Sequence, residues 1–142
     1  MAVLPVFAFF ALCALLVLLS GVKVYRQLVR RGEETFAART AAQYVTMRVR
    51  QAESVTVTDF EGCESLTVSE TIDGERWLTR VYCHEGFLRE LYCVENAALH
   101  PQDGEKILPL ENLGFSLEED LLTVYFPQRE VLLCLNGKGE AP

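Results

Sequence analysis

The first 22 residues, MAVLPVFAFFALCALLVLLSGV, contain no charged side chain. As a helix with a rise of about 1.5 Å per residue they would reach about 33 Å, which matches a hydrocarbon core of about 30 Å. Pro5 falls near the first turn, where its missing N–H costs little. A cleaved signal peptide fits less well, because no basic segment precedes the apolar run and no A-x-A site follows it. We therefore expect residues 1–22 to form a retained transmembrane anchor.

The charges beyond this anchor are unevenly distributed. Residues 23–53 carry seven basic and three acidic side chains, a net charge of +4. Residues 54–142 carry six basic and 17 acidic side chains, a net charge of −11, and the two together give the −7 of the chain. The basic segment suggests a helix that docks on its own domain or meets lipid head groups, with ordinary solvated charge as the alternative. The acidic domain argues against nucleic acid as the main partner.

Residues 23–53 contain no Pro and a single Gly, which predicts an amphipathic helix continuous with the anchor. Small and apolar residues at i, i+3, i+4 and i+7 form one stripe along it, namely Ala38, Ala41, Ala42, Val45, Val49 and Ala52. A second stripe, roughly opposite, consists of Tyr25, Leu28, Val29 and Phe36. Gly32 lies between the two stripes, so we expect either a bend there or a change of packing partner.

After Glu53 the apolar period changes to two, which predicts β-strands. Two turn signals, Asp73-Gly74 and Glu85-Gly86, are each flanked by alternating residues. Asp-Gly between such runs is a strong hairpin signal, because a type I′ turn needs positive φ at both central residues. If both turns have two residues, residue i pairs with 147 − i in the first hairpin and with 171 − i in the second.

This register sorts the side chains into two faces. The predicted core face contains Leu66, Val68, Trp77, Thr79, Val81, Cys83, Leu88 and Tyr92. The other face, which we expect to be wet, contains Thr67, Ser69, Arg80, Tyr82, His84 and Arg89. Leu78, Phe87 and Leu91 need partial cover there, and Glu90 lies on the core face, which suggests that it is near an edge.

Three more strands are predicted towards the C-terminus, with turns at Glu118–Asp120 and Pro127–Glu130. Their alternating residues are Leu113, Phe115 and Leu117, then Leu122, Val124 and Phe126, then Val131, Leu133 and Leu135. Residues 96–105 between the two groups read as a loop. One helix and an antiparallel meander over residues 54–142 make the fold α+β, with the small-residue stripe of the helix packed closely on the apolar face of the sheet.

Four cysteines, Cys63, Cys83, Cys93 and Cys134, belong to this domain and allow three pairings if oxidised. The register places Cys83 and Cys93 on different faces, so a bridge between them is not expected. No C-x-x-C motif supports a zinc or thioredoxin-like site. We favour free thiols, and the redox state stays open.

No catalytic constellation is recognisable. The two histidines are His84 and His100, and Cys83 and His84 are strand neighbours whose side chains point to opposite faces. The acidic residues Glu118–Asp120 fall at a turn, where they are solvated. We therefore predict a protein that is not an enzyme, with no catalytic, cofactor-binding or metal-binding residues and no cofactor.

A membrane span that runs directly into a helix lying on a small antiparallel sheet is the layout of type IV pilins and pseudopilins. Short motifs occur in the anchor, the helix and both hairpins: Gly21-x-x-x-Tyr25-Arg26, Arg39-Thr40-Ala41, Tyr44-Val45, Val49-Arg50-Gln51, Ile72-Asp73-Gly74, Thr79-Arg80-Val81-Tyr82 and Gly86-Phe87-Leu88-Arg89-Glu90-Leu91. With these motifs the chain resembles an uncharacterised bacterial family of short single-pass proteins, a domain of unknown function. The resemblance implies a pilin-like structural or assembly component of a type IV pilus, competence or secretion apparatus.

Two features depart from the prepilin pattern. Met1 opens directly on the apolar run without a basic leader ending in Gly, and position 5 is Pro5 rather than Glu. Either the chain is an uncleaved relative, or the true start lies upstream. Lys23, Arg26 and Arg30 follow the anchor, so the positive-inside rule places the domain in the cytoplasm. The resemblance places it outside the cytoplasm, which we expect, because an upstream basic leader would remove the conflict.

Partners follow from the same layout. We expect membrane lipid around the anchor and other single-pass pilin-like proteins along the N-terminal helix, with the domain extracytoplasmic. The alternative is a stand-alone membrane-tethered binding module whose sheet or whose loop of residues 96–105 captures a ligand.

Overall fold

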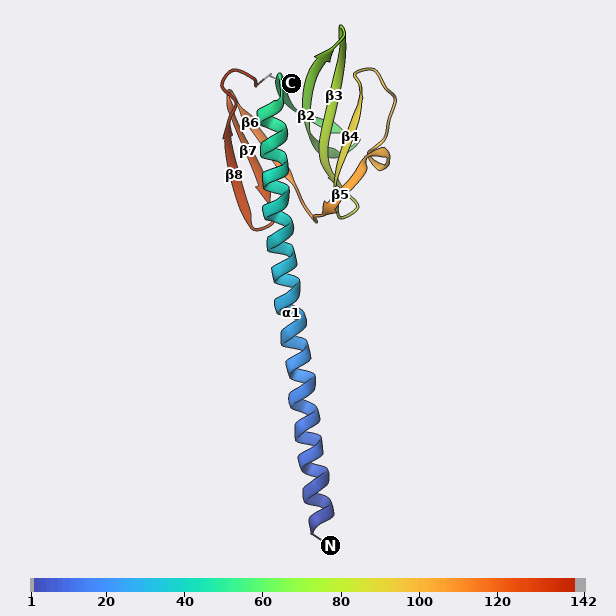
Figure 1. The fold of residues 1–142 in the computed structure, drawn as a ribbon, viewed down its shortest axis with the longest axis vertical. Helices are drawn as coiled ribbons and strands as arrows, with labels where there is room; N and C mark the ends of the chain where they lie inside the picture. The colour runs from blue at the N-terminus through green and yellow to red at the C-terminus, as the bar shows by residue number, and fades with distance from the viewer. Residues whose placement is uncertain (1, 140–142) are drawn as a thin grey trace. The chain divides into compact units, whose positions relative to one another are not determined.

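The computed structural model describes residues 2–139 and divides the chain into two compact units, separated between Thr35 and Phe36. Helix α1 (Val3–Gln51) contributes to both units (Figure 1). In the first unit its side chains are all exposed, and the helix is long and apolar enough to cross a membrane. The N-terminal helix is therefore a candidate membrane span.

Helix α1 runs through Gly32 without interruption. The second stripe remains exposed at Tyr25, Leu28 and Phe36, whereas the small-residue stripe is buried from Ala38 onward. The helix therefore does not break at Gly32, and the side-chain burial along it changes between the two stripes.

The second unit contains two antiparallel sheets, with the C-terminal part of α1 between them in Figure 1. One has the order β1 (Ser54–Phe60), β2 (Cys63–Ile72), β3 (Glu75–His84), β4 (Phe87–Val94) and β5 (Glu105–Pro109). The other has the order β6 (Gly114–Glu118), β7 (Leu121–Phe126) and β8 (Arg129–Cys134). The α+β class is confirmed, but the single meander is wrong, because the strands separate into two sheets that pack against one helix.

Both predicted registers are confirmed. Ser69 pairs with Leu78 across the β2–β3 turn, and Leu78 pairs with Cys93 across the β3–β4 turn. Asp73 and Gly74 have φ of 53° and 83°, the positive values that a type I′ turn requires. Glu85 and Gly86 have φ of 51° and 76°. Each turn therefore fixes which side chains face the helix.

Two strands are missing from the sequence-based description. Strand β1 pairs with β2 through a turn at Glu61 and Gly62, whose φ values of 50° and 84° match those of the two predicted turns. Strand β5 begins at Glu105, where the predicted loop ends, and it pairs with β4. Glu90 is the last residue of β4 that pairs with β5, so it does not lie at the edge itself but next to the part of β4 that β5 leaves unpaired.

The main core is shared by the helix and both sheets. From α1 it contains Ala38, Ala41, Ala42, Val45 and Val49, and from the strands and the segments beside them it contains Ala52, Val55, Leu66, Val68, Val81, Leu88, Leu110, Leu113, Phe115, Leu122, Val124, Phe126 and Leu135. The predicted docking of the small-residue stripe on the sheet is confirmed. Tyr92 was expected on this core face, but it is 49% exposed and stacks on Trp77 with ring centroids 5.0 Å apart.

The face of the larger sheet that was expected to be wet is instead covered. Residues Phe60, Leu78, Tyr82, Leu91 and Cys93 form a second, smaller core there, with Cys63 and Leu99 packed against it. Cys93 lies in this small core while Cys83 packs against the main one, so the two cysteines face opposite sides as predicted.

A loop carrying the short 3-10 helix η1 (Pro101–Asp103) is held over this second face by polar contacts. The Tyr82 hydroxyl donates a hydrogen bond of 2.7 Å to the Pro101 carbonyl, and the Arg89 guanidinium donates to the Gln102 and Gly104 carbonyls at 2.9 and 3.2 Å. A side chain at Gly104 would collide with the Tyr82 hydroxyl, which explains the glycine. Arg89 is only 3% exposed, and its charge is balanced by an ion pair of 3.0 Å with Glu85 as well as by the two loop carbonyls.

We predict that Ala41→Leu destabilises the second unit. Ala41 is fully buried against the sheets, so three added carbons must displace packed neighbours at a cost of about 1–3 kcal/mol in the free energy of unfolding. Urea unfolding of the detergent-solubilised full chain, followed by the fluorescence of its single tryptophan, Trp77, measures this. Gln43→Leu places the same side chain on an exposed face of the same helix and should change stability by less than about 0.5 kcal/mol. Equal unfolding curves for the two variants would contradict close packing of the stripe.

Candidate functional site

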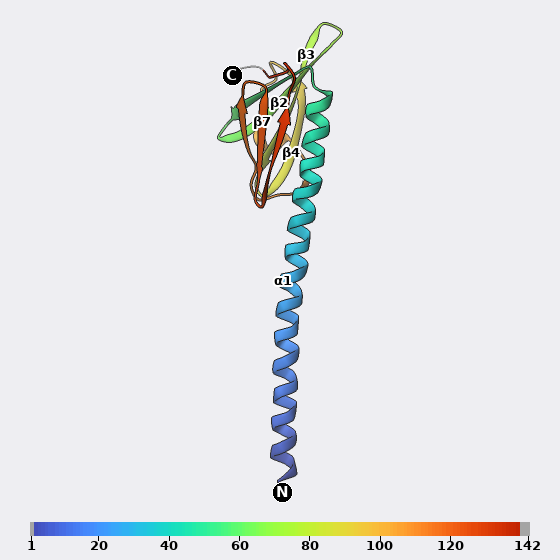
Figure 2. The same ribbon diagram turned by 90° about the vertical axis from the view of Figure 1, so that its left-hand side faces the viewer.

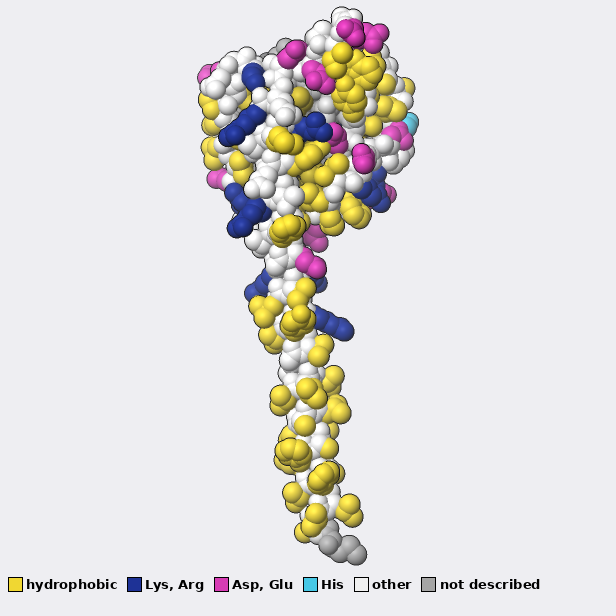
Figure 3. Space-filling model, in the orientation of Figure 1, with side chains coloured by type: hydrophobic (Ala, Val, Ile, Leu, Met, Phe, Trp, Pro, Cys, Tyr) yellow, Lys and Arg dark blue, Asp and Glu magenta, His cyan; other side chains and the backbone are white. Residues whose placement is uncertain are grey.

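The first unit presents an apolar surface with a basic end. The large hydrophobic side chains between Val3 and Leu19 are all more than half exposed. Four basic residues follow them on the same helix, namely Lys23, Arg26, Arg30 and Arg31. Figure 3 shows this helix covered with hydrophobic side chains along its length. Such a surface is suited to lipid or to neighbouring apolar helices.

In the second unit, an ion pair joins the helix to the core face of the sheet. Arg48 donates hydrogen bonds to both carboxylate oxygens of Glu90, at 2.6 and 3.1 Å, and its guanidinium also lies over the ring of Tyr44. This pair explains how an acidic side chain that is 14% exposed is accommodated on the core face. Burial raises the pKa of Glu90 above its ordinary value, and the charge of Glu105 adds to this effect. The pair is a structural connection between α1 and β4.

An open hollow lies between the helix and strand β8. Its volume is about 670 Å³, and it is lined by Arg39, Ala42, Gln43, Thr46, Met47, Arg50, Gln51, Arg129 and Val131. A second hollow of about 490 Å³ shares Arg50 with it and continues past residues 132–136 to Lys138. Figure 3 shows dark blue side chains gathered on this side of the helix, next to the sheet that contains β8. We call the two hollows together the β8 groove.

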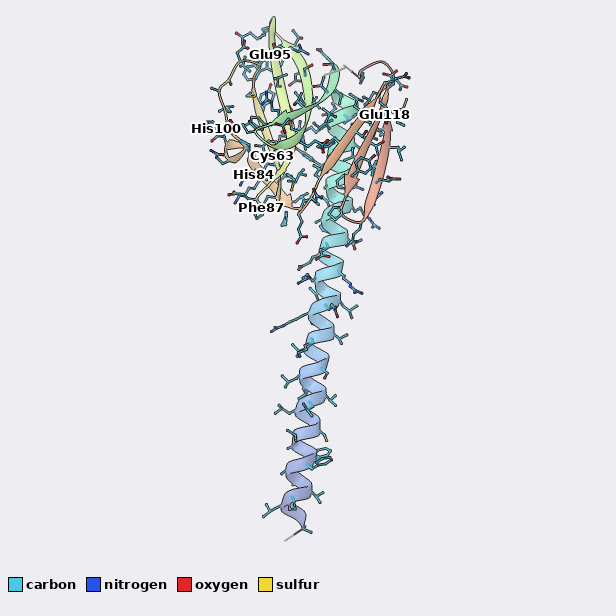
Figure 4. All side chains as sticks on the ribbon, turned by 180° about the vertical axis from the view of Figure 1, so that it is seen from behind. Cys63, His84, Phe87, Glu95, His100 and Glu118 are labelled. Carbon is cyan, nitrogen blue, oxygen red and sulfur yellow. The ribbon has the colours of Figure 1, made fainter. Side chains whose placement is uncertain are left out.

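A thiol–imidazole contact, which the sequence analysis did not identify, lies on the larger sheet. Cys63 Sγ and His84 Nδ1 are 3.5 Å apart, and His84 Nε2 is 4.0 Å from a carboxylate oxygen of Glu85 (Figure 4). The predicted register contained the signal, because 63 and 84 sum to 147 and so lie opposite each other. Cys83, the cysteine that was considered beside His84, donates instead to the Leu110 carbonyl at 2.9 Å, and burial raises the pKa of its thiol.

A neutral imidazole beside a thiol can accept its proton, which is one component of nucleophilic catalysis. Neither Cys63 nor His84 lines the β8 groove. His100, the other histidine, contacts the exposed Glu61 at 2.9 Å and is 59% exposed. Within residues 2–139, no three His, Cys, Asp or Glu side chains are grouped closely enough to hold a metal ion. The β8 groove is therefore separate from the thiol–imidazole contact and from both histidines.

Taken together, the helix and the two sheets define an α+β protein with a candidate membrane span at its N-terminus. A family model for a domain of unknown function (DUF4860) matches residues 36–128, which is more than half of the chain, and the chain belongs to this family. The match begins at Phe36, the same residue at which the second compact unit begins. The expected membership of an uncharacterised domain family is thus confirmed. No curated protein and no solved structure matches the chain.

We predict that Arg48→Gln destabilises the second unit more at pH 7.5 than at pH 4.5. Removal of Arg48 leaves the ionised Glu90 carboxylate without its counter-charge, which we expect to cost about 1–2 kcal/mol at pH 7.5 because the pair is only partly buried. The pKa of Glu90 is already raised by burial, so the folded state protonates this carboxyl before the unfolded chain does. The penalty of an ionised Glu90 therefore grows as pH rises and disappears as pH falls.

The double variant Arg48→Gln with Glu90→Gln provides the control for this prediction. Because it buries no charge at this position, its unfolding free energy should recover most of the loss and should lack the added pH dependence. Urea unfolding at both pH values measures all three proteins. A loss in Arg48→Gln that is the same at pH 7.5 and pH 4.5 would show that the guanidinium acts through packing on Tyr44 alone.

Proposed function

We propose that the protein is a membrane-anchored, pilin-like structural or assembly component of a type IV pilus, competence or secretion apparatus. One observation carries the proposal: the long apolar helix is exposed throughout the first unit and continues into the helix that organises the sheet domain. In pilin-like proteins, this arrangement allows single-pass helices to pack against each other while the domains remain outside the bundle.

The exposed stripe of α1 supports assembly through the helix. Leu28 is 62% exposed and Phe36 is 72% exposed. In lipid, packing between neighbouring helices supplies contact energy for such surfaces, because lipid tails are as apolar as the side chains and offer no hydrophobic gain by themselves. Membrane lipid and other single-pass pilin-like proteins are therefore the proposed partners, and the domain is proposed to be extracytoplasmic.

This proposal does not include catalysis. Neither residue of the thiol–imidazole contact lines the β8 groove, and the pair of Arg48 with Glu90 joins α1 to β4. The alternative function is a stand-alone membrane-tethered binding module, and the β8 groove is the observation that favours it.

We predict that photo-crosslinkers placed at Leu28 and Phe36 capture other single-pass helical proteins, including further copies of this chain. The reason is that both side chains are more than half exposed on α1. Mass spectrometry of the adducts from native membranes identifies the captured proteins. A crosslinker at Tyr125, an exposed residue of the smaller sheet, is the matched control and should not capture helical proteins. Adducts with lipid alone at Leu28 and Phe36 would favour the binding-module alternative.

We predict that protease added to intact protoplasts removes the sheet domain, residues 54–142. An extracytoplasmic domain is exposed to the protease, whereas a cytoplasmic one is shielded by the membrane. Immunoblotting with an antibody against the domain follows its loss, and a cytoplasmic marker protein reports whether the protoplasts stayed intact. If the domain is digested only after lysis, the basic residues after the anchor set the orientation according to the positive-inside rule.

A further inference from the structure

The smaller sheet ends in an exposed strand edge at β8. An edge strand presents unpaired N–H and C=O groups to any extended chain that can reach them, so proteins commonly protect such edges. In the order β6–β7–β8, no strand among the described residues pairs with the far side of β8. In Figure 2, β8 (red) lies beside the C-terminal part of α1.

The terminal strands at the other three sheet edges each have a feature that limits pairing with a further strand. Strand β1 is bridged to Gly139, and its Val55 N–H donates to the Lys138 carbonyl at 2.8 Å. Strand β6 packs against β1 and β2, and its Phe115 N–H donates to Glu64 at 3.1 Å. Strand β5 has five residues, ends in Pro109 and carries Lys106, which are common devices against edge pairing. Among the described residues, the edge at β8 has no pairing strand and lies beside the β8 groove.

The groove beside this edge is basic in an otherwise acidic domain. Arg39, Arg50 and Arg129 line the larger hollow, and Lys138 lines the smaller one. Among the described residues, no acidic side chain lines either hollow, although residues 54–142 carry a net charge of −11. The alternation of β8 places Glu130 on the face opposite Arg129 and Val131. Cations gathered in this way attract an anionic ligand and repel basic ones.

The apolar parts of the groove indicate a ligand with side chains as well as charge. Met47 is 49% exposed at its wall, and Val131 and Ala42 contribute further carbon surface. A strand of six residues such as β8 spans about 20 Å, which sets the length of chain that can pair with it. An extended peptide can make all three kinds of contact. Its backbone can pair with the edge, its apolar side chains can pack on the wall of the groove, and its carboxylates can contact the arginines.

We propose that the β8 groove binds an extended acidic segment of a partner protein, which adds to the smaller sheet as a strand beside β8. Its backbone pairs with the β8 edge, and its acidic side chains contact Arg39, Arg50 and Arg129. Binding of this type uses main-chain hydrogen bonds for affinity and the alternating side chains for selectivity. The inference goes beyond the proposed function and does not depend on assembly through the anchor.

The test measures binding of a labelled peptide to the full chain in non-ionic detergent micelles by fluorescence anisotropy. The probe is an eight-residue peptide in which Glu alternates with Val or Thr. We expect saturable binding that weakens as salt rises from about 0.05 to about 0.5 M, because salt screens exposed charges. The variant Arg39→Gln with Arg50→Gln and Arg129→Gln should weaken binding by about tenfold or more.

The matched control is Arg26→Gln with Arg30→Gln and Arg31→Gln, which removes the same charge from the first unit of the same chain and should change binding less than about twofold. Trp77 fluorescence in urea checks that each variant is folded. If the triple variant unfolds, the single variants Arg39→Gln and Arg129→Gln replace it, and each should weaken binding about threefold. Equal weakening by the control would show attraction by overall charge and would overturn the proposal.

Two further probes separate strand addition from other ways of binding an anion. The same peptide with alternate backbone nitrogens methylated keeps its charge but cannot pair with an edge strand, so we expect its binding to be lost. Equal binding of the methylated peptide, or of a peptide with Lys in place of Glu, would overturn the proposal. Absence of binding by the acidic peptide would also overturn the proposal. If phosphatidylglycerol vesicles then bind in a way that depends on the groove arginines, the groove binds lipid head groups instead.

Discussion

The packing of one helix stripe against two sheets is the constraint on which the second unit depends. The larger and smaller sheets meet in one core, and the residues of α1 in that core are Ala38, Ala41, Ala42, Val45 and Val49. Three of these are alanines, so the helix backbone approaches both sheets closely and leaves little side-chain volume between them. Large residues on this stripe would push the sheets apart, because interiors packed at crystal-like density do not absorb added volume.

Polar groups fix the arrangement that the apolar core permits. Arg48 and Glu90 join α1 to β4 on one face of the larger sheet, and Arg89 holds the loop of η1 on the other. Both arginines use several donors of the planar guanidinium, which a lysine cannot imitate. The larger sheet is therefore covered on both faces. The helix and the smaller sheet cover one face, and the loop between β4 and β5 covers the other.

The sequence predicted the parts of this fold whose determinants are local. The Asp73-Gly74 and Glu85-Gly86 turns set two registers because the backbone at those residues needs positive φ. The Glu61-Gly62 turn carries the same weak signal as Glu85-Gly86. Strand β1 was nevertheless not predicted, because the residues before this turn were not recognised as a strand. The separation into two sheets and the cover over Tyr82 depend on contacts between distant segments, which no local pattern encodes.

The candidate sites divide in the same way. The contact between Cys63 and His84 follows from the register of the first predicted hairpin, so it could be predicted from the sequence. The β8 groove could not be predicted in this way. It combines Arg39 and Arg50 of the helix with Arg129 of a strand about eighty residues away, and the packing of the two sheets brings these residues together.

The β8 groove is a consequence of the narrow stripe that organises the core. A stripe of small residues contacts the sheets along a narrow line, so the neighbouring helix face, with Arg39, Gln43, Met47 and Arg50, overhangs β8 without packing on it. A wider apolar face would have filled this space and covered the edge of β8. The same alanines that bring the helix and the sheets together thus leave the edge of β8 beside Arg39, Arg50 and Arg129.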